Sequence, residues 1–453
     1  MLATLAAALF SGLPVAIVLM AVGFSFGGAG MLIGAVRPTD FGAIYFRVYG
    51  SLADSDEILY ASVPLLVFMG ATLQRAGLAT DLLAGVQGIV RGVPGGLAVA
   101  VVVLGAVLAP TAGVIGASVT ALGLIALPFM LQQGYRPADA AGVVAAAGTL
   151  GVIVPPGIML FFIGDAIGVQ VPAIFLGMLG PLALLLACYV AFAVVALRPA
   201  RNTASAGNAR VPQASRCASA WRLMPPLLLI GAVLMSIVLG WTSLSESAAV
   251  GALGAASIAA LQRRFSLADL DAAIRQTILT TGMVFFIFLG ASVFSLVFRL
   301  LGGNDLIVGA LKSLQLGGTG TLLAILLIVF ALGFFFDWLE IVLVTFPILR
   351  PLLEVLDFGT HLAPHLTLYW IAVLLALNLQ TSFLTPPFGF ALFLLKAVAP
   401  PSIGLAEVYR GIVPYVLIQI FVIAAVIACP AIATWLPDQL FDLSLPRGGK
   451  FKE

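Results

Sequence analysis

The chain has 453 residues, of which 62% are hydrophobic and only 9% are charged, and its formal net charge is +2. An ordinary soluble domain is about 45–50% apolar and about 25% charged, so this composition excludes a water-soluble globular fold. The sequence has no basic run interleaved with aromatic residues, so nothing in it supports nucleic-acid binding.

Long segments without Asp, Glu, Lys or Arg predict an all-α polytopic membrane protein. A helix needs about 20 apolar residues to cross a hydrocarbon core of about 30 Å. The short apolar runs lack strand-like alternation, which argues against a β-barrel. The apolar N-terminus lacks a basic region and a small-residue cleavage site, so we expect a retained helix rather than a signal peptide. The uncharged segments are residues 1–36, 92–135, 140–164, 166–197, 223–245, 276–298, 313–336, 358–395 and 411–437.

We predict that residues 1–197 form a first repeat. Its elements, in chain order, are scaffold helices over about 1–77, an interfacial helix over about 78–92, a re-entrant hairpin over about 95–131 and a broken helix over about 140–164. The interfacial helix is expected because this segment mixes charged with apolar residues. The linker 198–222 holds five Arg and no acidic residue. The positive-inside rule therefore places it in the cytoplasm.

Residues 223–437 are predicted to form the second repeat, and 438–453 a polar tail. Scaffold helices over about 223–262 are followed by an interfacial helix over about 264–275, a re-entrant hairpin over about 319–356 and a broken helix over about 366–396. Ser266 has the residue type and position to cap the helix that follows it.

The hairpin prediction starts from residues 92–135. One straight helix over this segment would be about 66 Å long, roughly twice the bilayer core, so the chain must turn. The best turn is PTAGVIGAS at 110–118, which carries no charge. A turn exposed to water usually has charged or strongly polar residues, so we expect a tip within the membrane. Two full spans joined by a tight turn are the alternative.

The same ordered signals occur in both halves. PTAGVIGAS is followed by Pro128 and then GTLGVIVPPG (148–157), while GFFFDWLEI (333–341) is followed by Pro347 and then NLQTSFLTPPFG (378–389). Interrupted apolar segments at corresponding positions of two halves indicate a transporter's binding site near the bilayer midplane.

Each double proline predicts an unwound stretch of helix. Pro155–Pro156 and Pro386–Pro387 lie inside uncharged runs, and proline in a helix interior removes a donor and clashes with the preceding turn. In lipid, unwound backbone is tolerated only where it is packed in protein or lines a wet cavity. A sodium ion would satisfy the freed carbonyl oxygens, and the half-helix N-termini would face an anionic substrate. Proline kinks satisfied by neighbouring helices are the alternative. The oxygen-bearing side chains beside the breaks are Thr149, Asn378, Thr381, Ser382 and Thr385.

Two carboxylates fall between apolar runs in the second half. Asp337 and Glu340 occupy the place that corresponds to the tip of the first hairpin. Ionisable groups at membrane depth are functional candidates, and an ordinary turn outside the membrane is the alternative. The three cysteines are scattered and lack metal-ligand spacing. No HExxH motif, nucleophile elbow or Walker loop occurs, so the sequence does not predict an enzyme.

Three segments carry a resemblance to a known family. GASVTALGLIALPFM, QGYRPADAAGVVAAAGTLGVIVPPG and NLQTSFLTPPFGFALFLLKAVAPPSI closely resemble the large permease subunit of TRAP (tripartite ATP-independent periplasmic) transporters. The resemblance extends over nearly the whole chain. DWLEI (337–341) and TSFLTPPFGF are most similar to the branch labelled for mannitol or chloroaromatic compounds.

The resemblance implies a sodium-coupled carrier of organic acids, such as carboxylates or keto acids, in the bacterial inner membrane. It implies two inverted-topology repeats that form an elevator-type ion-transporter architecture. It also implies two partners: a small four-helix membrane subunit and a periplasmic substrate-binding protein. A stand-alone ion-coupled anion carrier of the same superfamily is the alternative, and a membrane-embedded enzyme is a further one. The sequence does not identify the substrate, because in such systems the capture protein largely selects it.

Transferred position by position, the resemblance implies two or more Na⁺ sites between the hairpin tips and the breaks. The implied metal-binding residues are Gly116, Ser118, Gly148, Thr149, Val152, Pro155, Asp337, Asn378, Thr381, Thr385, Pro386 and Gly389. The implied substrate-binding residues are Thr111, Gly113, Ala117, Pro156, Gly157, Glu340, Gln380 and Ser382. Two positions depart from the family pattern, because Gly157 stands where a serine is common and Gln380 where a glutamate is common.

Overall fold

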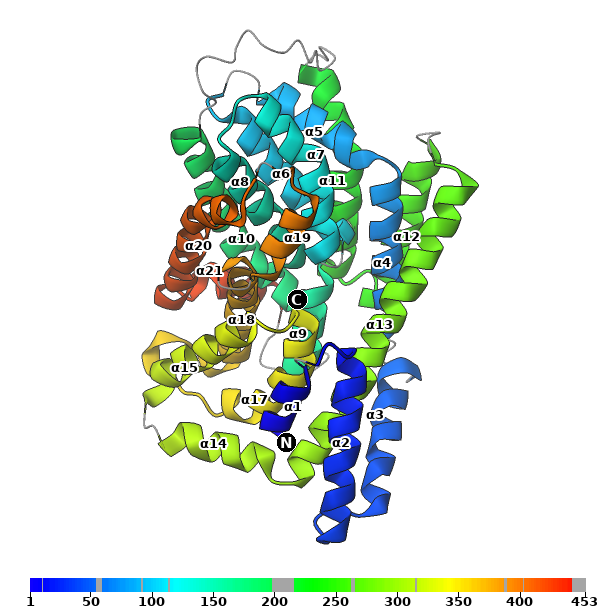
Figure 1. The fold of residues 1–453 in the computed structure, drawn as a ribbon, viewed down its shortest axis with the longest axis vertical. Helices are drawn as coiled ribbons and strands as arrows, with labels where there is room; N and C mark the ends of the chain where they lie inside the picture. Colours follow the sequence, from blue (N-terminus) through cyan, green and yellow to red (C-terminus); the bar gives the residue numbers. More distant parts are fainter. Residues whose placement is uncertain are drawn as a thin grey trace.

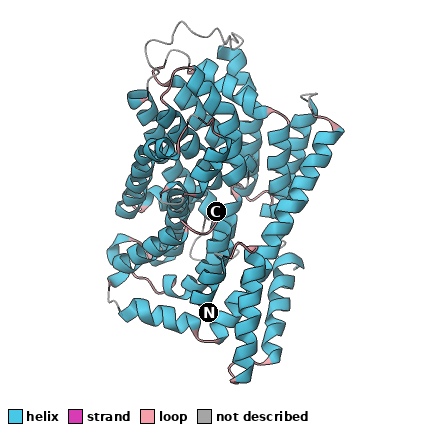
Figure 2. Ribbon diagram, viewed as in Figure 1, coloured by secondary structure: helices cyan, strands magenta, loops and turns pink. Residues whose placement is uncertain are grey.

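The computed structural model is built of helices (Figure 2). It describes the chain except for residues 10, 54–58, 91–92, 113–114, 198–215, 262–264, 314–315, 387–388, 402 and 442–453. Six of the described helices are long and apolar enough to cross a membrane: Val15–Leu32, Val171–Ala196, Leu244–Leu261, Leu267–Leu300, Pro364–Leu384 and Leu405–Ala428. The predicted all-α fold class is confirmed.

The described part of the first half runs from α1 to α10. Its helices are α1 (Leu2–Leu9), α2 (Val15–Leu32), α3 (Gly42–Ala53), α4 (Ser62–Arg75), α5 (Leu78–Ile89), α6 (Gly96–Ala112), α7 (Ile115–Gln132), α8 (Pro137–Thr149), α9 (Ile158–Ile167) and α10 (Val171–Ala196). Short turns η1 (Pro38–Phe41), η2 (Leu59–Ala61) and η3 (Leu150–Val152) connect them. The pair α6–α7 occupies the predicted hairpin, and α8–α9 the predicted broken helix.

The second half has a matching order. Its helices are α11 (Arg216–Val238), α12 (Leu244–Leu261), α13 (Leu267–Leu300), α14 (Gly303–Ser313), α15 (Gly317–Leu332), α16 (Trp338–Glu340), α17 (Phe346–Leu353), α18 (Thr367–Leu384), α19 (Phe390–Val398), α20 (Leu405–Ala428) and α21 (Ala431–Leu440). A π-helical turn, η4 (Ile341–Thr345), joins α16 to α17, and η5 (Gly359–His361) and η6 (Pro364–Leu366) precede α18.

The predicted interfacial helix at 264–275 is wrong as a separate element. These residues begin the 34-residue helix α13, because no proline or glycine interrupts the chain between Leu267 and Thr281. The predicted cap is present: the Ser266 hydroxyl accepts a hydrogen bond from the Asp269 backbone N–H at 3.2 Å. The short helix that leads into the second hairpin is instead α14. The linker also ends earlier than predicted, since α11 begins at Arg216.

The two halves place their hairpins at opposite ends of the molecule. Figure 1 shows α5, α6 and α7 toward the top and α14, α15 and α17 toward the bottom. In the first half α4 contacts α12, and in the second half α13 contacts α2. The stretch α3–α4 thus has the place in the first half that α13 has in the second. This arrangement fits the predicted inverted repeat, and the depth of the hairpin tips in a membrane stays a prediction.

The packing places most of the described helices in two groups. The group that we call the scaffold consists of α2, α3, α4, α11, α12 and α13. The group that we call the hairpin unit contains both hairpins, both broken helices, α10 and α20. Within it, α8 packs tightly on α20, because a methyl group on Gly142 would overlap the carbonyl oxygen of Gly411. Contacts of α4 with α6 and of α13 with η4 join the two groups.

Candidate substrate and ion site

The first break lies directly against the first hairpin. A methyl group placed on Gly148 would come within 2.7 Å of Val119 Cγ2, so the backbone of α8 packs directly against a side chain of α7. Gly105 of α6 is equally close to Ala147 on the other side of α8. This packing brings the predicted residues Ser118, Gly148 and Thr149 together. All three are buried.

Two backbone oxygens converge beside the first break. A Cβ atom on Gly157 would lie 3.0 Å from both the Val152 and the Val154 carbonyl oxygens. These carbonyls follow the last turn of α8 and precede α9, whose N-cap is Gly157. Pro155 and Pro156, which connect Val154 to Gly157, are buried. The break therefore presents unwound backbone oxygens in the protein interior, as the sequence predicts.

Buried or half-buried hydroxyls lie beside both breaks and keep free lone pairs. The Thr149 hydroxyl, which is fully buried, donates to the Ala146 carbonyl at 2.9 Å. Those of Thr381 and Thr385 donate to the Leu377 and Thr381 carbonyls, each at 2.8 Å. A hydroxyl that donates one hydrogen bond keeps two acceptor lone pairs. These oxygens can therefore still bind a cation.

The second break is tied to the second hairpin by side chains of α18. The Asn378 amide donates to the Leu326 carbonyl of α15 at 2.8 Å. Ser382 lies against Gly333, where a Cβ atom would overlap its hydroxyl. α18 ends at Leu384, and the chain resumes as α19 after Gly389, which has a φ of +51°. Only glycine adopts that conformation readily. Pro386 is half-buried.

Two buried polar side chains in this region lack a hydrogen-bond partner among the described residues. Both amide atoms of Gln380, which is fully buried, are unpaired there, and so is the Ser118 hydroxyl. An unpaired buried polar group costs about 1–3 kcal/mol. A bound ion or polar ligand would remove that cost.

The helices that follow the breaks cross over to the other half's hairpin. α19 packs along α7, where a methyl group on Gly116 would lie 3.3 Å from Leu394 Cδ1. α9 packs against η4 and α17. Each break is therefore joined to the hairpin of the other half, and the two breaks and the two hairpins form one continuous cluster within the hairpin unit.

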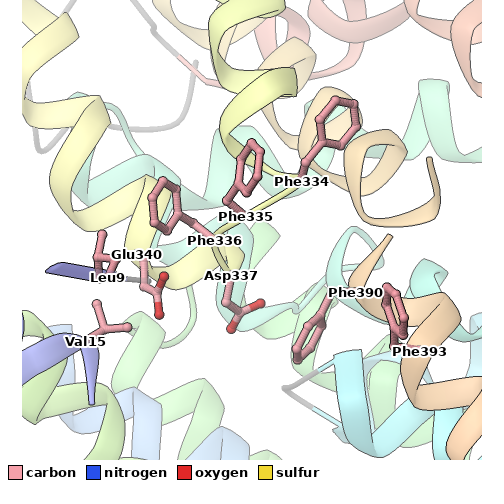
Figure 3. A pocket seen from close by; sticks show the side chains of 9 residues that line it. All are labelled: Leu9, Val15, Phe334, Phe335, Phe336, Asp337, Glu340, Phe390 and Phe393. Carbon is pink, nitrogen blue, oxygen red and sulfur yellow. The ribbon is translucent and has the colours of Figure 1, made fainter. Parts of the chain in front are cut away.

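A cavity of about 390 Å³ opens beside the tip of the second hairpin. We call it the phenylalanine cavity. Figure 3 shows its wall, with the carboxylates of Asp337 and Glu340 among aromatic rings. Leu9 of α1 and Val15 of α2 complete the wall. The rings belong to Phe334, Phe335, Phe336, Phe390 and Phe393.

The sequence missed these rings, because apolar residues carry no signal of binding in an apolar chain. It also missed Gly105 and Val154, whose roles depend on packing. Gly113 lies outside the described residues. The side chains of Thr111 and Ala117 also lie outside that description.

A family model of the tripartite ATP-independent periplasmic transporters, DctM component, matches residues 2–432. The chain belongs to this family. It is therefore the large permease subunit of a TRAP transporter, a multi-pass protein of the inner membrane and not an enzyme. The narrower resemblance to the mannitol or chloroaromatic branch stays a prediction.

Curated relatives agree over almost the full length. The ectoine/5-hydroxyectoine TRAP large permease of Ruegeria pomeroyi is 28% identical over 97% of this chain and 98% of its own length. The C4-dicarboxylate permease of Pseudomonas aeruginosa is 28% identical over 85% of this chain and 88% of its own. The sialic acid permease of Vibrio cholerae is 24% identical, covering 96% of each.

A solved structure shares the fold. The YdaH transporter of Alcanivorax borkumensis superposes with a TM-score of 0.58 at 15% identity, covering 85% of this chain and 91% of that one. The described helices of this TRAP permease thus adopt an architecture seen in another membrane transporter.

Proposed function

We propose that this permease moves an organic acid across the inner membrane in symport with sodium, by an elevator motion of the hairpin unit against the scaffold. Substrate comes from a periplasmic binding protein, and a small four-helix membrane subunit completes the system. The relatives that carry C4-dicarboxylates, sialic acid and ectoines support this substrate class.

The supporting observation is the pair of helix breaks, with two converging backbone carbonyls beside the first and buried or half-buried hydroxyls beside both. Sodium is a hard cation that prefers oxygen ligands, as calcium and magnesium do. The Val152 and Val154 carbonyls and the Thr149 hydroxyl supply such ligands at the first break, and Thr381, Thr385 and Asn378 supply them at the second. The donor set fits the ion.

The elevator motion is inferred from the grouping of the helices. Both breaks and both hairpins belong to one unit, so the unit can move with its cargo enclosed. The scaffold meets this unit mainly through α4 and α13. Such a motion exposes the site to each side of the membrane in turn.

The test is uptake by proteoliposomes that contain both membrane subunits, with the binding protein outside. Labelled succinate, sialic acid and ectoine serve as first probes. Uptake should require an inward sodium gradient. Uptake that persists when the gradient is collapsed would exclude sodium coupling, and uptake without the binding protein would favour the stand-alone carrier.

Thr149→Val and Thr385→Val test the ion ligands. Each replacement keeps the side-chain volume but removes one oxygen. We expect the sodium concentration for half-maximal uptake to rise about tenfold, the equivalent of about 1.4 kcal/mol. Thr321→Val is the control, because that hydroxyl lies on α15, away from the breaks, and bonds only the Gly317 carbonyl among the described residues. Unchanged sodium dependence in both variants would indicate that these threonines are structural.

A further inference from the structure

The phenylalanine cavity holds two carboxyl groups and, among its described lining residues, no basic side chain. Asp337 and Glu340 lie three residues apart on one helical turn, and both line the cavity. The described lining residues include no Lys, Arg or His. One oxygen of Asp337 is buried without a hydrogen-bond partner in the described part of the chain. Two neighbouring carboxylates repel each other when both are ionised. A positive charge beside them offsets this repulsion.

The walls of the cavity favour an organic cation over a metal ion. A hard metal ion needs a shell of about six oxygen ligands, whereas the side chains of this lining offer oxygens from two residues only. The rest of the wall is five phenylalanine rings and two aliphatic side chains. Aromatic faces attract ammonium groups by the cation–π interaction, which is the usual way that proteins recognise quaternary ammonium ligands.

The size and position of the cavity suit a small zwitterion. Its volume of about 390 Å³ is within the range of about 300–1,000 Å³ that is usual for small-molecule sites. Phe390 and Phe393 belong to the first turn of α19, which follows the second break. Helix N-termini favour negative charge. In the view of Figure 3, Glu340 lies toward Leu9 and Val15, on the side away from these two rings.

We propose that the phenylalanine cavity binds the positively charged group of a zwitterionic substrate, an organic acid that also carries an ammonium or amidinium group. Glu340 and Asp337 pair with the cationic end, the phenylalanine rings of the second hairpin lie beside it, and the carboxylate faces the N-terminus of α19. This substrate class rests on the proposed transport function and narrows it. A dianionic acid would meet repulsion from the same two carboxylates.

The experiment measures thermal unfolding of the purified complex of both membrane subunits at constant sodium chloride. Glycine betaine is the zwitterionic probe, and succinate is the dianionic one. Betaine should raise the unfolding midpoint more than succinate does. In Glu340→Gln the betaine concentration for half-maximal stabilisation should rise at least tenfold. Phe336→Leu removes an aromatic face from the Glu340 side of the cavity and keeps an apolar side chain, so it should weaken betaine binding by a few fold.

Glu354→Gln is the matched control. This carboxylate lies on the same hairpin but outside the cavity, where it forms an exposed ion pair with Arg350 at 2.8 Å. Its betaine response should equal that of the unaltered protein. Equal responses to betaine and succinate, no betaine response, or an unchanged one in Glu340→Gln would overturn the proposal. Loss of sodium stabilisation alone in Glu340→Gln would also overturn it, because the cavity would then be an ion site.

A sodium titration of the same samples separates this inference from the proposed function. If sodium does not stabilise the complex but betaine does, sodium coupling fails and the cavity assignment stands. If sodium stabilises the complex but betaine does not, the cavity assignment fails alone.

Discussion

Gly157, which stands where the family resemblance suggests a serine, lies against the backbone of the first break. Its hydrogen faces two carbonyl oxygens, and even a Cβ atom there would sit 3.0 Å from each. A serine at this position, which the family resemblance leads us to expect, would have to displace these oxygens by a few tenths of an ångström. We infer that the glycine leaves the carbonyls of Val152 and Val154 as ligands in place of a serine hydroxyl.

Gly157→Ala should therefore weaken sodium binding. The added methyl group occupies the space beside both oxygens, and we expect the sodium concentration for half-maximal thermal stabilisation to rise about tenfold, the equivalent of about 1.4 kcal/mol. Gly231→Ala is the control, because nothing lies within 4 Å of a Cβ atom at that position on α11. Equal sodium dependence in the two variants would mean that the carbonyls do not bind the ion.

At the scale of single residues, the sequence identified those whose role follows from their neighbours in the chain. The double prolines identify the breaks, and the hydroxyls of Thr149 and Thr385 lie within a few residues of them. The phenylalanine cavity was not predicted, because it joins Leu9 near the N-terminus to Phe393 near the other end of the chain. Asp337 and Glu340 were singled out as charges in an apolar context, but their aromatic surroundings depend on that long-range packing.

At the scale of single elements, helix breaks were easier to predict than helix continuity. Proline pairs end α8 and α18 within a few residues of the expected positions. In contrast, charges near Asp271 and Arg275 suggested a separate surface helix. These two residues form an exposed ion pair at 2.7 Å on the first turns of α13. The charged residues therefore lie in the first turns of one long helix and do not separate two helices.

Close packing of α8 on α20 depends on the absence of a side chain at Gly411. A Cβ atom at this position would overlap the Ala138 carbonyl oxygen, so Gly411→Ala must push the helices apart. Overpacking of this kind costs about 1–3 kcal/mol, which exceeds the gain of about 1 kcal/mol in helix propensity. We expect a lower unfolding midpoint and slower uptake.

The matched control is Gly282→Ala on α13, where a Cβ atom meets nothing within 4 Å. It gains the same helix propensity without the overlap, so its unfolding midpoint should stay unchanged or rise. Both midpoints can be measured in detergent by tryptophan fluorescence. A Gly411→Ala midpoint as high as that of Gly282→Ala would show that α8 and α20 have room to separate.

At the scale of the whole molecule, the division into scaffold and hairpin unit was predictable only in part. The repeated signals in the sequence indicated which segments form hairpins and breaks. They did not indicate which scaffold residues touch the hairpin unit, because those contacts join separate elements whose packing no local pattern encodes. Tyr60 of η2 is the clearest example. It is buried against Phe161, Phe162 and Phe288.

The Tyr60 hydroxyl donates a hydrogen bond of 2.8 Å to Asp165 at the end of α9, and so links the scaffold to the hairpin unit. An elevator motion must break this bond. A hydrogen bond to a charged group contributes about 1.5–3 kcal/mol. Tyr60→Phe should therefore lower the equilibrium ratio of the present conformation to the moved one by about tenfold or more, since 1.4 kcal/mol is a factor of ten.

A cysteine in place of Phe335, which is 49% exposed beside the cavity, would report that shift. With the native cysteines replaced by serine, an impermeant maleimide should label it more slowly in Tyr60→Phe, from the side on which it reacts otherwise. Tyr45→Phe is the control, because Tyr45 lies on the exposed scaffold helix α3. If both variants label equally fast, the bond to Asp165 does not hold the two units together and another contact, such as that of α13 with η4, must do so.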